Sequence, residues 1–160
     1  MITDPKTHLP GLIRVLEKQR IQFRILPAQS PESNALIVWL ERSFPISYSQ
    51  IAWSKVPSHR CLNWSDPDDL VVKFQEIVVG LSISSLVVVS WANDLCPSIE
   101  MHLGDVLRLS REIFEAFETS LDTWIMCREE NWCIEMHHEG TLCRGRGRTD
   151  IVFLGVKESL

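Results

Sequence analysis

The chain has 160 residues, of which 45% are hydrophobic, an ordinary composition for one folded domain. No run reaches the roughly 20 apolar positions that a membrane-spanning helix needs, and the start, MITDPKTHLP, lacks the basic-then-apolar pattern of a signal peptide. Five cysteines at irregular spacings favour free thiols over a disulfide framework. We therefore expect a single globular domain over residues 1–160, located in the cytoplasm.

The net charge of −5 is unevenly distributed along the chain. Residues 1–60 carry a net charge of +4, residues 61–140 a net charge of −11 and residues 141–160 a net charge of +2. General nucleic-acid binding relies on a basic surface, so this acidic chain is a poor candidate for it. Because complementary charge steers association, the acidic section suits a basic protein partner. The alternative is that most soluble proteins are mildly acidic without such a partner.

The first part of the chain predicts a helix followed by two strands. Residues 9–20 carry apolar side chains at helical spacing. Residues 21–26 alternate between apolar and polar side chains, which indicates a strand that Pro27 ends. Residues 28–34 are rich in turn formers. Residues 35–41, ALIVWLE, are apolar on both faces and therefore predict a central strand.

The next helix has a clear start signal. Residues 44–57 fit either a short helix or an irregular segment, and residues 59–67 are expected to form a loop. Asp66 then serves as a helix cap and Pro67 occupies the first turn. Gly80 marks the end of this helix. The predicted buried face consists of Leu70, Val71, Phe74, Ile77 and Val78.

The strongest strand prediction is residues 86–91, LVVVSW, which are mostly β-branched and apolar on both faces. Residues 92–103 are expected to form a loop, and residues 105–120 a second long helix. The apolar stripe of that helix consists of Val106, Leu109, Ile113 and Phe117.

Residues 123–140 predict a β-hairpin, because two alternating runs flank Glu129-Glu130-Asn131. A three-residue connection ending in Asn suits a hairpin, since Asn tolerates a left-handed backbone. In this register Met126 lies opposite Ile134. The face expected to join the core consists of Trp124, Met126, Arg128, Trp132, Ile134 and Met136. The face expected to be half-covered consists of Thr123, Ile125, Cys127, Cys133, Glu135 and His137.

The C-terminal residues predict a basic turn and a last strand. The stretch CRGRGR places Arg144, Arg146 and Arg148 together, in a pattern that can touch phosphate. Three Arg without interleaved aromatic residues in an acidic chain favour a flexible turn over residues 141–148. Residues 151–156 are a candidate for a final strand. The whole pattern predicts an α+β (mixed α/β) domain of two layers, with a mostly antiparallel sheet, packed helices and a C-terminal β-hairpin.

Two groups of side chains invite a chemical interpretation. Cys127, Cys133 and His137 share one face of the predicted hairpin, so three metal ligands are conceivable there. Zinc sites usually contain close pairs such as Cys-x-x-Cys, which the chain lacks, and we expect neither a metal nor another cofactor. His137 and His138 are predicted to point to opposite faces of a strand, so they cannot converge on one substrate. The expectation is therefore a protein that is not an enzyme.

Exposed acidic residues with a neighbouring Trp are the favoured candidates for partner binding. The alternative for the Asp residues is helix capping, and for the Glu residues plain solvation. The candidate residues are Trp64, Asp66, Asp68, Asp69, Asp94, Glu129 and Glu130.

The C-terminal half also resembles a known group of proteins. The segments Asp122-Thr123-Trp124-Ile125, ENWCIE over residues 130–135, and His138-Glu139-Gly140 are similar to the C-terminal hairpin of small bacterial immunity proteins. Those proteins belong to contact-dependent growth inhibition and related polymorphic-toxin systems. The resemblance spans residues 84–143. It implies a cytoplasmic inhibitor without catalysis that binds one cognate toxin, often a basic nuclease, and blocks its active site.

Two other functions stay open at this point. One is a small metal-dependent or Cys/His enzyme centred on Cys127, Cys133 and His137. The other is a structural adaptor domain, which would bind its partner through the same acidic residues but whose partner is not a toxin. Six Trp residues suit an interface as well as a core, yet no heptad or exposed stripe defines an oligomeric state.

Overall fold

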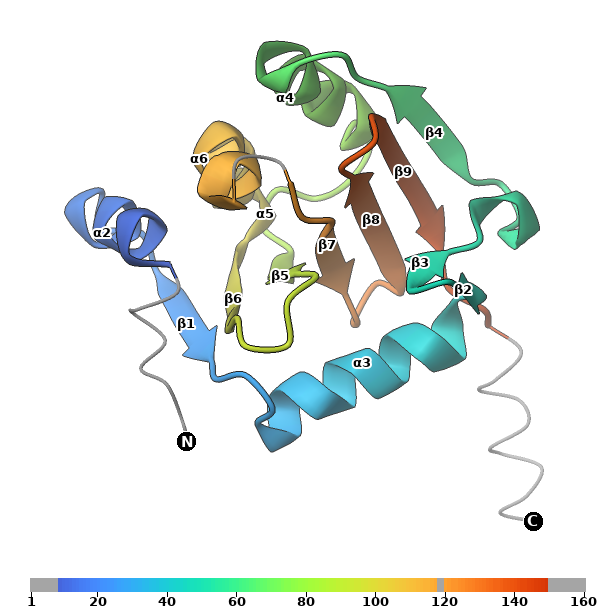
Figure 1. Cartoon of the computed structure of the whole chain (residues 1–160), viewed down its shortest axis with the longest axis horizontal. Helices are drawn as coiled ribbons and strands as arrows, with labels where there is room; N and C mark the ends of the chain where they lie inside the picture. The colour runs from blue at the N-terminus through green and yellow to red at the C-terminus, as the bar shows by residue number, and fades with distance from the viewer. Residues whose placement is uncertain (1–8, 118–119, 150–160) are drawn as a thin grey trace.

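The computed structural model describes residues 9–117 and 120–149. In this part of the chain, seven strands form one sheet in the order β1-β6-β5-β7-β8-β9-β4, and every neighbouring pair is antiparallel (Figure 1). A separate two-stranded hairpin joins β2 to β3. The strands are β1 (Phe23–Leu26), β2 (Ile46–Ser47), β3 (Gln50–Ile51), β4 (Arg60–Asn63), β5 (Leu86–Trp91), β6 (Ser98–His102), β7 (Thr123–Cys127), β8 (Trp132–His137) and β9 (Thr141–Arg146).

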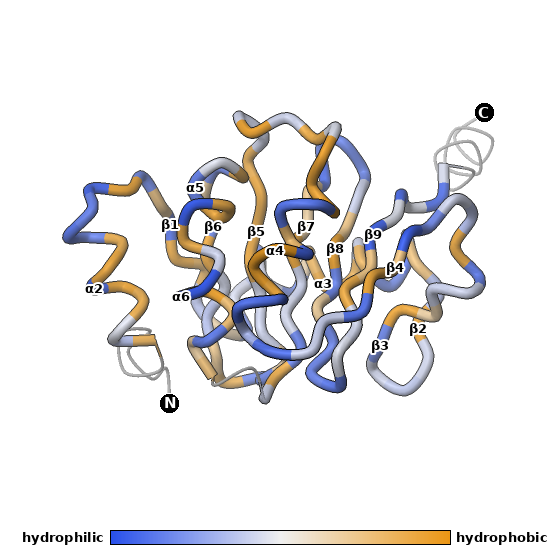
Figure 2. The backbone as a smooth tube through the Cα atoms, turned by 90° about the horizontal axis from the view of Figure 1, so that it is seen from above, coloured by the Kyte–Doolittle hydropathy of each residue, from blue (hydrophilic) through white to orange (hydrophobic). Residues whose placement is uncertain are grey.

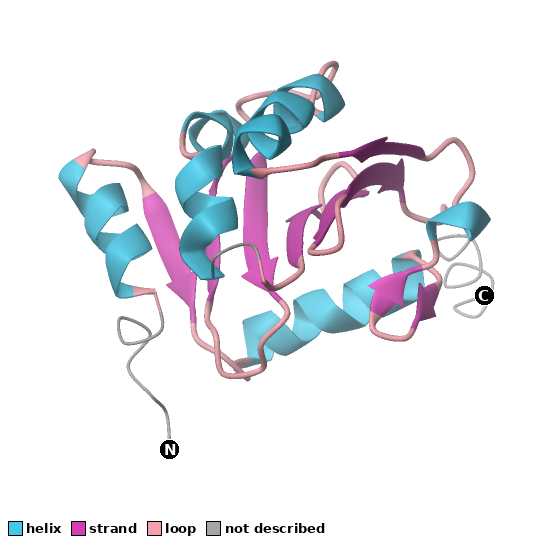
Figure 3. Ribbon diagram, turned by 45° about the horizontal axis from the view of Figure 1, so that its top comes forward, coloured by secondary structure: helices cyan, strands magenta, loops and turns pink. Residues whose placement is uncertain are grey.

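Helices cover both faces of the sheet. The α-helices are α2 (Pro10–Lys18), α3 (Pro31–Ser43), α4 (Pro67–Ile77), α5 (Leu103–Arg108) and α6 (Ser110–Phe114), and the 3-10 helices are η1 (Trp53–Lys55) and η2 (Glu115–Phe117). Figure 3 shows α3 on one side of the sheet and α4 with its neighbours on the other. None of the described helices combines the length and the hydropathy that a membrane span would need.

Two apolar cores follow from this arrangement, one on each face. The larger core packs α2, α4, α5 and α6 against the sheet, with Phe74 and Phe114 in edge-to-face contact at 5.2 Å between ring centroids. The smaller core lies under α3, where Leu36 and Leu40 meet Met126 and the β3–η1 segment. Figure 2 shows the hydrophobic colour concentrated in the central strands that both cores share. The middle of the sheet is therefore buried on both sides.

The predicted α+β class is confirmed, as are several elements. Helix α2 lies within residues 9–20, and β5 has the predicted bounds. Helix α4 begins as predicted, because the Asp66 carboxylate accepts a hydrogen bond from the Asp69 N–H at 2.8 Å and Pro67 follows in the first turn. Gly80 beyond this helix has a φ of +90°.

The prediction of a central strand at residues 35–41 was wrong, because this segment lies within α3. Ser30 caps the helix by accepting a hydrogen bond from the Ser33 N–H at 3.2 Å. The helix buries one stripe, which includes Leu36 and Leu40. Ile37 and Val38 instead face solvent, with 50% and 43% of their surfaces exposed. Two exposed apolar residues therefore gave a helical segment the appearance of a strand buried on both faces.

Three strands fall where loops or turns were predicted. Residues 59–67 contain β4, residues 92–103 contain β6, and the basic stretch 141–148 contains β9. In β9 the Arg144 guanidinium donates to the carbonyl oxygens of Ile77 and Val79 at 2.8 and 2.9 Å, and burial lowers its pKa. The prediction of a flexible basic turn was therefore wrong.

The long helix predicted over residues 105–120 is divided. Helix α5 ends before Leu109, where the backbone has a φ of −108°, and α6 follows. The buried residues Val106, Leu109 and Ile113 nevertheless lie in the larger core as expected. The strand predicted at residues 151–156 lies outside the described residues.

The β7–β8 hairpin exists, but its register differs from the predicted one by one residue. The connection has four residues, 128–131, and Cys127 lies opposite Trp132 while Ile125 lies opposite Ile134. Asn131 has the expected left-handed backbone, with a φ of +57°. A shift of one residue turns one strand over relative to its partner. One face therefore carries Thr123, Ile125, Cys127, Trp132, Ile134 and Met136, and the other carries Trp124, Met126, Cys133, Glu135 and His137.

The five cysteines divide into one disulfide and three thiols. Cys61 on β4 lies directly opposite Cys143 on β9, and the two are bonded. Cys96, Cys127 and Cys133 are free and buried. The prediction of free thiols is confirmed for Cys96, Cys127 and Cys133 and wrong for Cys61 and Cys143. The sequence did not indicate that these two are in contact, because 82 residues separate them. Disulfides are rare in reducing compartments, and the cytoplasmic location stays a prediction.

We predict that thiol labelling separates these two classes. Burial raises the pKa of Cys96 to about 12 and also raises the pKa values of Cys127 and Cys133, so the reactive thiolate is scarce at pH 8. Iodoacetamide should label no cysteine rapidly in the folded protein, three in denaturant alone and five after reduction in denaturant, as counted by intact mass spectrometry. Five labels without reductant would contradict the disulfide.

Candidate functional site

A cluster of polar side chains lies where β7 begins and β8 ends. Asp122 precedes β7, His137 closes β8, and His138 follows in the turn. The Asp122 Oδ1 accepts hydrogen bonds from the His138 backbone N–H at 2.9 Å and from the His138 ring Nδ1 at 2.8 Å. The Asp122 Oδ2 lies 3.8 Å from the His137 Nε2. One carboxylate therefore meets two imidazole rings.

The expectation that His137 and His138 point to opposite faces was wrong. Their ring centroids lie 4.6 Å apart. Strand β8 ends at His137, so the alternation of side chains stops there and His138 folds back with the turn. Gly140, with a φ of +107°, completes that turn.

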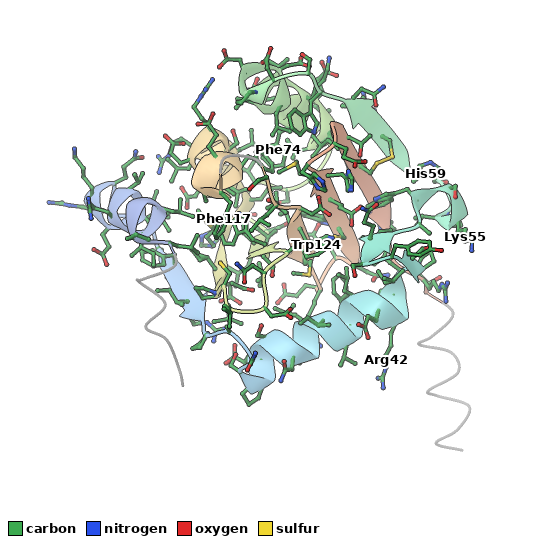
Figure 4. All side chains as sticks on the ribbon, viewed as in Figure 1. Arg42, Lys55, His59, Phe74, Phe117 and Trp124 are labelled. Carbon is green, nitrogen blue, oxygen red and sulfur yellow. A yellow bond between two sulfur atoms is a disulfide. The ribbon has the colours of Figure 1, made fainter. Side chains whose placement is uncertain are left out.

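Next to this cluster, Glu135 is almost fully buried on β8, with 3% of its surface exposed. Its carboxylate accepts hydrogen bonds from the Trp124 Nε1 at 2.7 Å, the Trp53 Nε1 at 3.0 Å and the Ile51 backbone N–H at 3.1 Å. Burial raises the pKa of Glu135, the three hydrogen bonds oppose that rise, and the nearby Asp122 charge adds to it. Trp53 belongs to η1 and Trp124, labelled in Figure 4, belongs to β7, so Glu135 ties the β3–η1 segment to the sheet.

The predicted metal trio of Cys127, Cys133 and His137 does not form. In the observed register Cys127 belongs to the larger core and Cys133 to the smaller one. Burial also raises the pKa of both thiols, which suits inert core residues and opposes a role as nucleophile. Cys127 therefore cannot converge with Cys133 and His137 on one ion or substrate.

The predicted residues at the start of α4 lie together, and most of them have structural partners. The Trp64 indole donates to the Thr141 carbonyl oxygen at 3.2 Å. Asp66 caps α4, and Asp69 accepts from the Ser65 N–H at 3.0 Å. Asp68 is 82% exposed at its side chain and forms an ion pair with Arg111. The capping alternative is thus confirmed for Asp66.

The other predicted residues do not join this group. Glu130 lies at the β7–β8 turn, where it accepts from the Ser85 hydroxyl just before β5. Asp94 follows the opposite end of β5, and six strand residues span about 20 Å. Glu129 lines a groove beside α3 that also contains Arg24 and Arg128. The seven candidates are therefore spread over several parts of the surface.

A second groove, of about 480 Å³, lies along the other side of α3. Its apolar lining includes Ile37 and Leu40 on α3, Ile46 on β2 and Trp124 on β7. Two carboxylates, Glu41 and Asp94, line the groove together with neutral residues, and no basic side chain lines it. Among the described residues neither carboxylate has an ion-pair partner. We call this the α3 groove.

The β2–β3 hairpin beside the α3 groove presents the one Tyr of the chain. Tyr48 is 97% exposed, and Ser49 next to it lines the groove. Both residues have left-handed backbones, with φ values of +52° and +63°. A two-residue turn of this kind strongly prefers Asn-Gly, because other residues are strained at positive φ. The hairpin therefore carries strain where it displays a large aromatic side chain.

No protein-family model matches the chain, and no characterised protein is significantly similar to it in sequence.

We predict that Glu135 is essential for stability. Glu135→Ala removes the acceptor of three buried N–H groups, and each unsatisfied group costs about 1–3 kcal/mol, so the free energy of unfolding should fall by about 3 kcal/mol or more in urea. Glu135→Gln keeps one acceptor oxygen and should cost less. Glu41→Ala, an exposed acidic control, should leave the unfolding free energy unchanged. An equal effect of Glu135→Ala and Glu41→Ala would contradict the network.

Proposed function

We propose that this chain is a non-enzymatic binding domain of the immunity-protein type, which neutralises a basic toxin by docking on the α3 groove and the Tyr48 hairpin. The observation that carries the proposal is Tyr48, fully exposed on a strained turn. Non-glycine residues held at positive φ persist where the surrounding structure fixes them and often mark functional sites. Exposed Tyr side chains are among the commonest anchors of protein interfaces.

The apolar surface around Tyr48 supports the same proposal. Ile37, Val38 and Ile46 are each more than 40% exposed on α3 and β2. Large apolar side chains that gather beside a groove are typical of interaction sites. The groove lining adds Trp124, which is half-buried. A partner that covers this surface would bury an aromatic and aliphatic centre.

The charges of the α3 groove favour a basic partner. Glu41 and Asp94 are exposed there, and no cation lines the groove to neutralise them. On the other side of α3, by contrast, Arg24 pairs with Glu32 at 2.7 Å and with Glu100 at 3.1 Å. Acidic groups without a partner steer cationic surfaces toward themselves. Asp94 thus keeps the partner-binding role proposed for it, whereas Asp66, Asp69 and Glu130 already serve the fold.

The proposal that the partner is a toxin rests on the resemblance of residues 84–143 to immunity proteins. An inhibitor needs no catalytic group of its own, which agrees with the inert buried thiols. An acidic surface with an apolar centre suits the occlusion of a basic nuclease active site. A toxin gene beside the gene of this chain would separate the immunity function from that of a general adaptor.

The test combines affinity capture with matched variants. Wild-type bait should retain one basic protein from lysate of the source organism at both low and high salt, as identified by mass spectrometry. With that protein purified, Tyr48→Asn with Ser49→Gly should weaken binding by about 2 kcal/mol, roughly thirtyfold, because it removes the anchor. Asn-Gly suits the turn, so the variant should be at least as stable as wild type.

Charge reversal tests the location of the surface. Glu41→Lys with Asp94→Lys should slow association about tenfold at low salt and less at high salt. Asp68→Lys with Glu76→Lys changes the charge of α4 by the same amount and should leave the rate nearly unchanged. A larger effect of the α4 variant would place the partner at α4, and no captured protein at either salt would contradict the proposed function.

A further inference from the structure

The cluster at the end of β8 has the composition of a metal site. One ligand atom from each of Asp122, His137 and His138 lies within 4.8 Å of the other two. Two imidazoles and a carboxylate are a common donor set for Zn²⁺ in proteins. The hard ions Mg²⁺ and Ca²⁺ prefer oxygen ligands and would not select two imidazoles.

Two distances between the donor atoms are close to those around a tetrahedral ion. Bonds of about 2.0–2.2 Å to Zn²⁺ place neighbouring ligand atoms about 3.3–3.5 Å apart. The Asp122 Oδ2 and the His137 Nε2 lie 3.8 Å apart, and the Asp122 Oδ1 and the His138 Nδ1 lie 2.8 Å apart. These two distances, one to each oxygen of the carboxylate, lie on either side of the required spacing, and an ion would take the place of the Gln50 contact at the His137 Nε2.

The cluster is held in place before any ion binds. The side chains of Asp122 and His137 are each only 10% exposed. The backbone N–H of His138 fixes one oxygen of Asp122 at 2.9 Å. The His138 side chain is 44% exposed, which leaves one side of the cluster open to solvent. An ion can therefore enter, and a water molecule can occupy a remaining coordination position.

Two further side chains can support the ligands. The Gln50 amide contacts the His137 Nε2, and because the His137 Nδ1 accepts from the Glu139 N–H at 3.2 Å, the Nε2 of the neutral ring carries the proton. In that tautomer the atom of Gln50 that can accept from Nε2 is its side-chain oxygen, an assignment that exchanges the two ends of the amide. When an ion binds the Nε2 atom, the proton of the neutral ring moves to Nδ1. The Nδ1 atom then no longer accepts from the Glu139 N–H. The Glu139 carboxylate, 3.9 Å from Nδ1, can accept a hydrogen bond from the Nδ1 proton.

We propose that Asp122, His137 and His138 bind one Zn²⁺ ion, with Gln50 and Glu139 as supporting residues. The ligands come from the start of β7 and the end of β8, and Gln50 comes from the β2–β3 hairpin. This ion site is independent of the proposed toxin binding, because its ligands are not among the side chains of the α3 groove or Tyr48. It differs from the trio of Cys127, Cys133 and His137, which the observed register separates.

The test uses the full chain purified without a polyhistidine tag and stripped with a chelator. Titration with ZnCl₂, followed by calorimetry and by equilibrium dialysis with elemental analysis, should show one tightly bound Zn²⁺ per chain. Asp122→Asn and His138→Ala should each abolish stoichiometric binding, and Glu139→Gln should weaken it about tenfold. Zn²⁺ should also raise the melting temperature of the wild type and not that of His138→Ala.

The matched control is His59→Ala. His59 lies at the periphery on the connection between β3 and β4 (Figure 4), and its ring contacts the Val56 carbonyl oxygen at 2.8 Å. This variant should bind Zn²⁺ like the wild type. His138 is exposed, so His138→Ala should fold even where Asp122→Asn does not. The proposal fails if the stripped wild type binds no Zn²⁺, or if His138→Ala binds Zn²⁺ as tightly as the wild type.

Discussion

A buried carboxylate on β8 holds together segments that lie more than 80 residues apart in sequence. Glu135 accepts hydrogen bonds from Trp53 and Ile51, which precede it by 82 and 84 residues, and from Trp124 on the neighbouring strand. Moving a carboxylate out of water is costly, and well-aligned N–H donors offset that cost. Because two of the three donors belong to the β3–η1 segment, this interaction determines where the β2–β3 hairpin leaves the sheet.

The position of the β2–β3 hairpin depends on the buried Glu135 network and determines where Tyr48 lies on the proposed binding surface. Once Ile51 and Trp53 are fixed, the chain must reverse over Tyr48 and Ser49, both of which adopt left-handed backbones. The indole of Trp124 binds Glu135 at its nitrogen and lines the α3 groove with its ring. The same buried network therefore positions both the exposed Tyr48 and the Trp124 side chain that lines the groove. The burial of Ile51 and Trp53 offsets the backbone strain at Tyr48 and Ser49.

Local signals predicted local structure well, and contacts distant in sequence explain the errors. The Asp66-Pro67 start of α4 and the apolar run of β5 depend only on neighbouring residues. Helix α3 was missed because exposed apolar residues filled its polar face, and these residues now belong to the proposed surface. The β7–β8 register was missed because a left-handed Asn131 suits connections of three or four residues. The contact of His137 with Asp122 could not be predicted, because it depends on where β8 ends and no residue pattern indicates that position.

The most direct test of the docking surface is site-specific photo-crosslinking. A benzoyl-phenylalanine at position 48 should crosslink to one basic protein in lysate of the source organism, and untagged wild-type chain should compete for that product. The same probe at Val79, which is 72% exposed beyond α4 on the other face of the sheet, should give no such product. Crosslinks at position 79 in place of position 48 would contradict the assignment of the α3 groove and the Tyr48 hairpin as the binding surface.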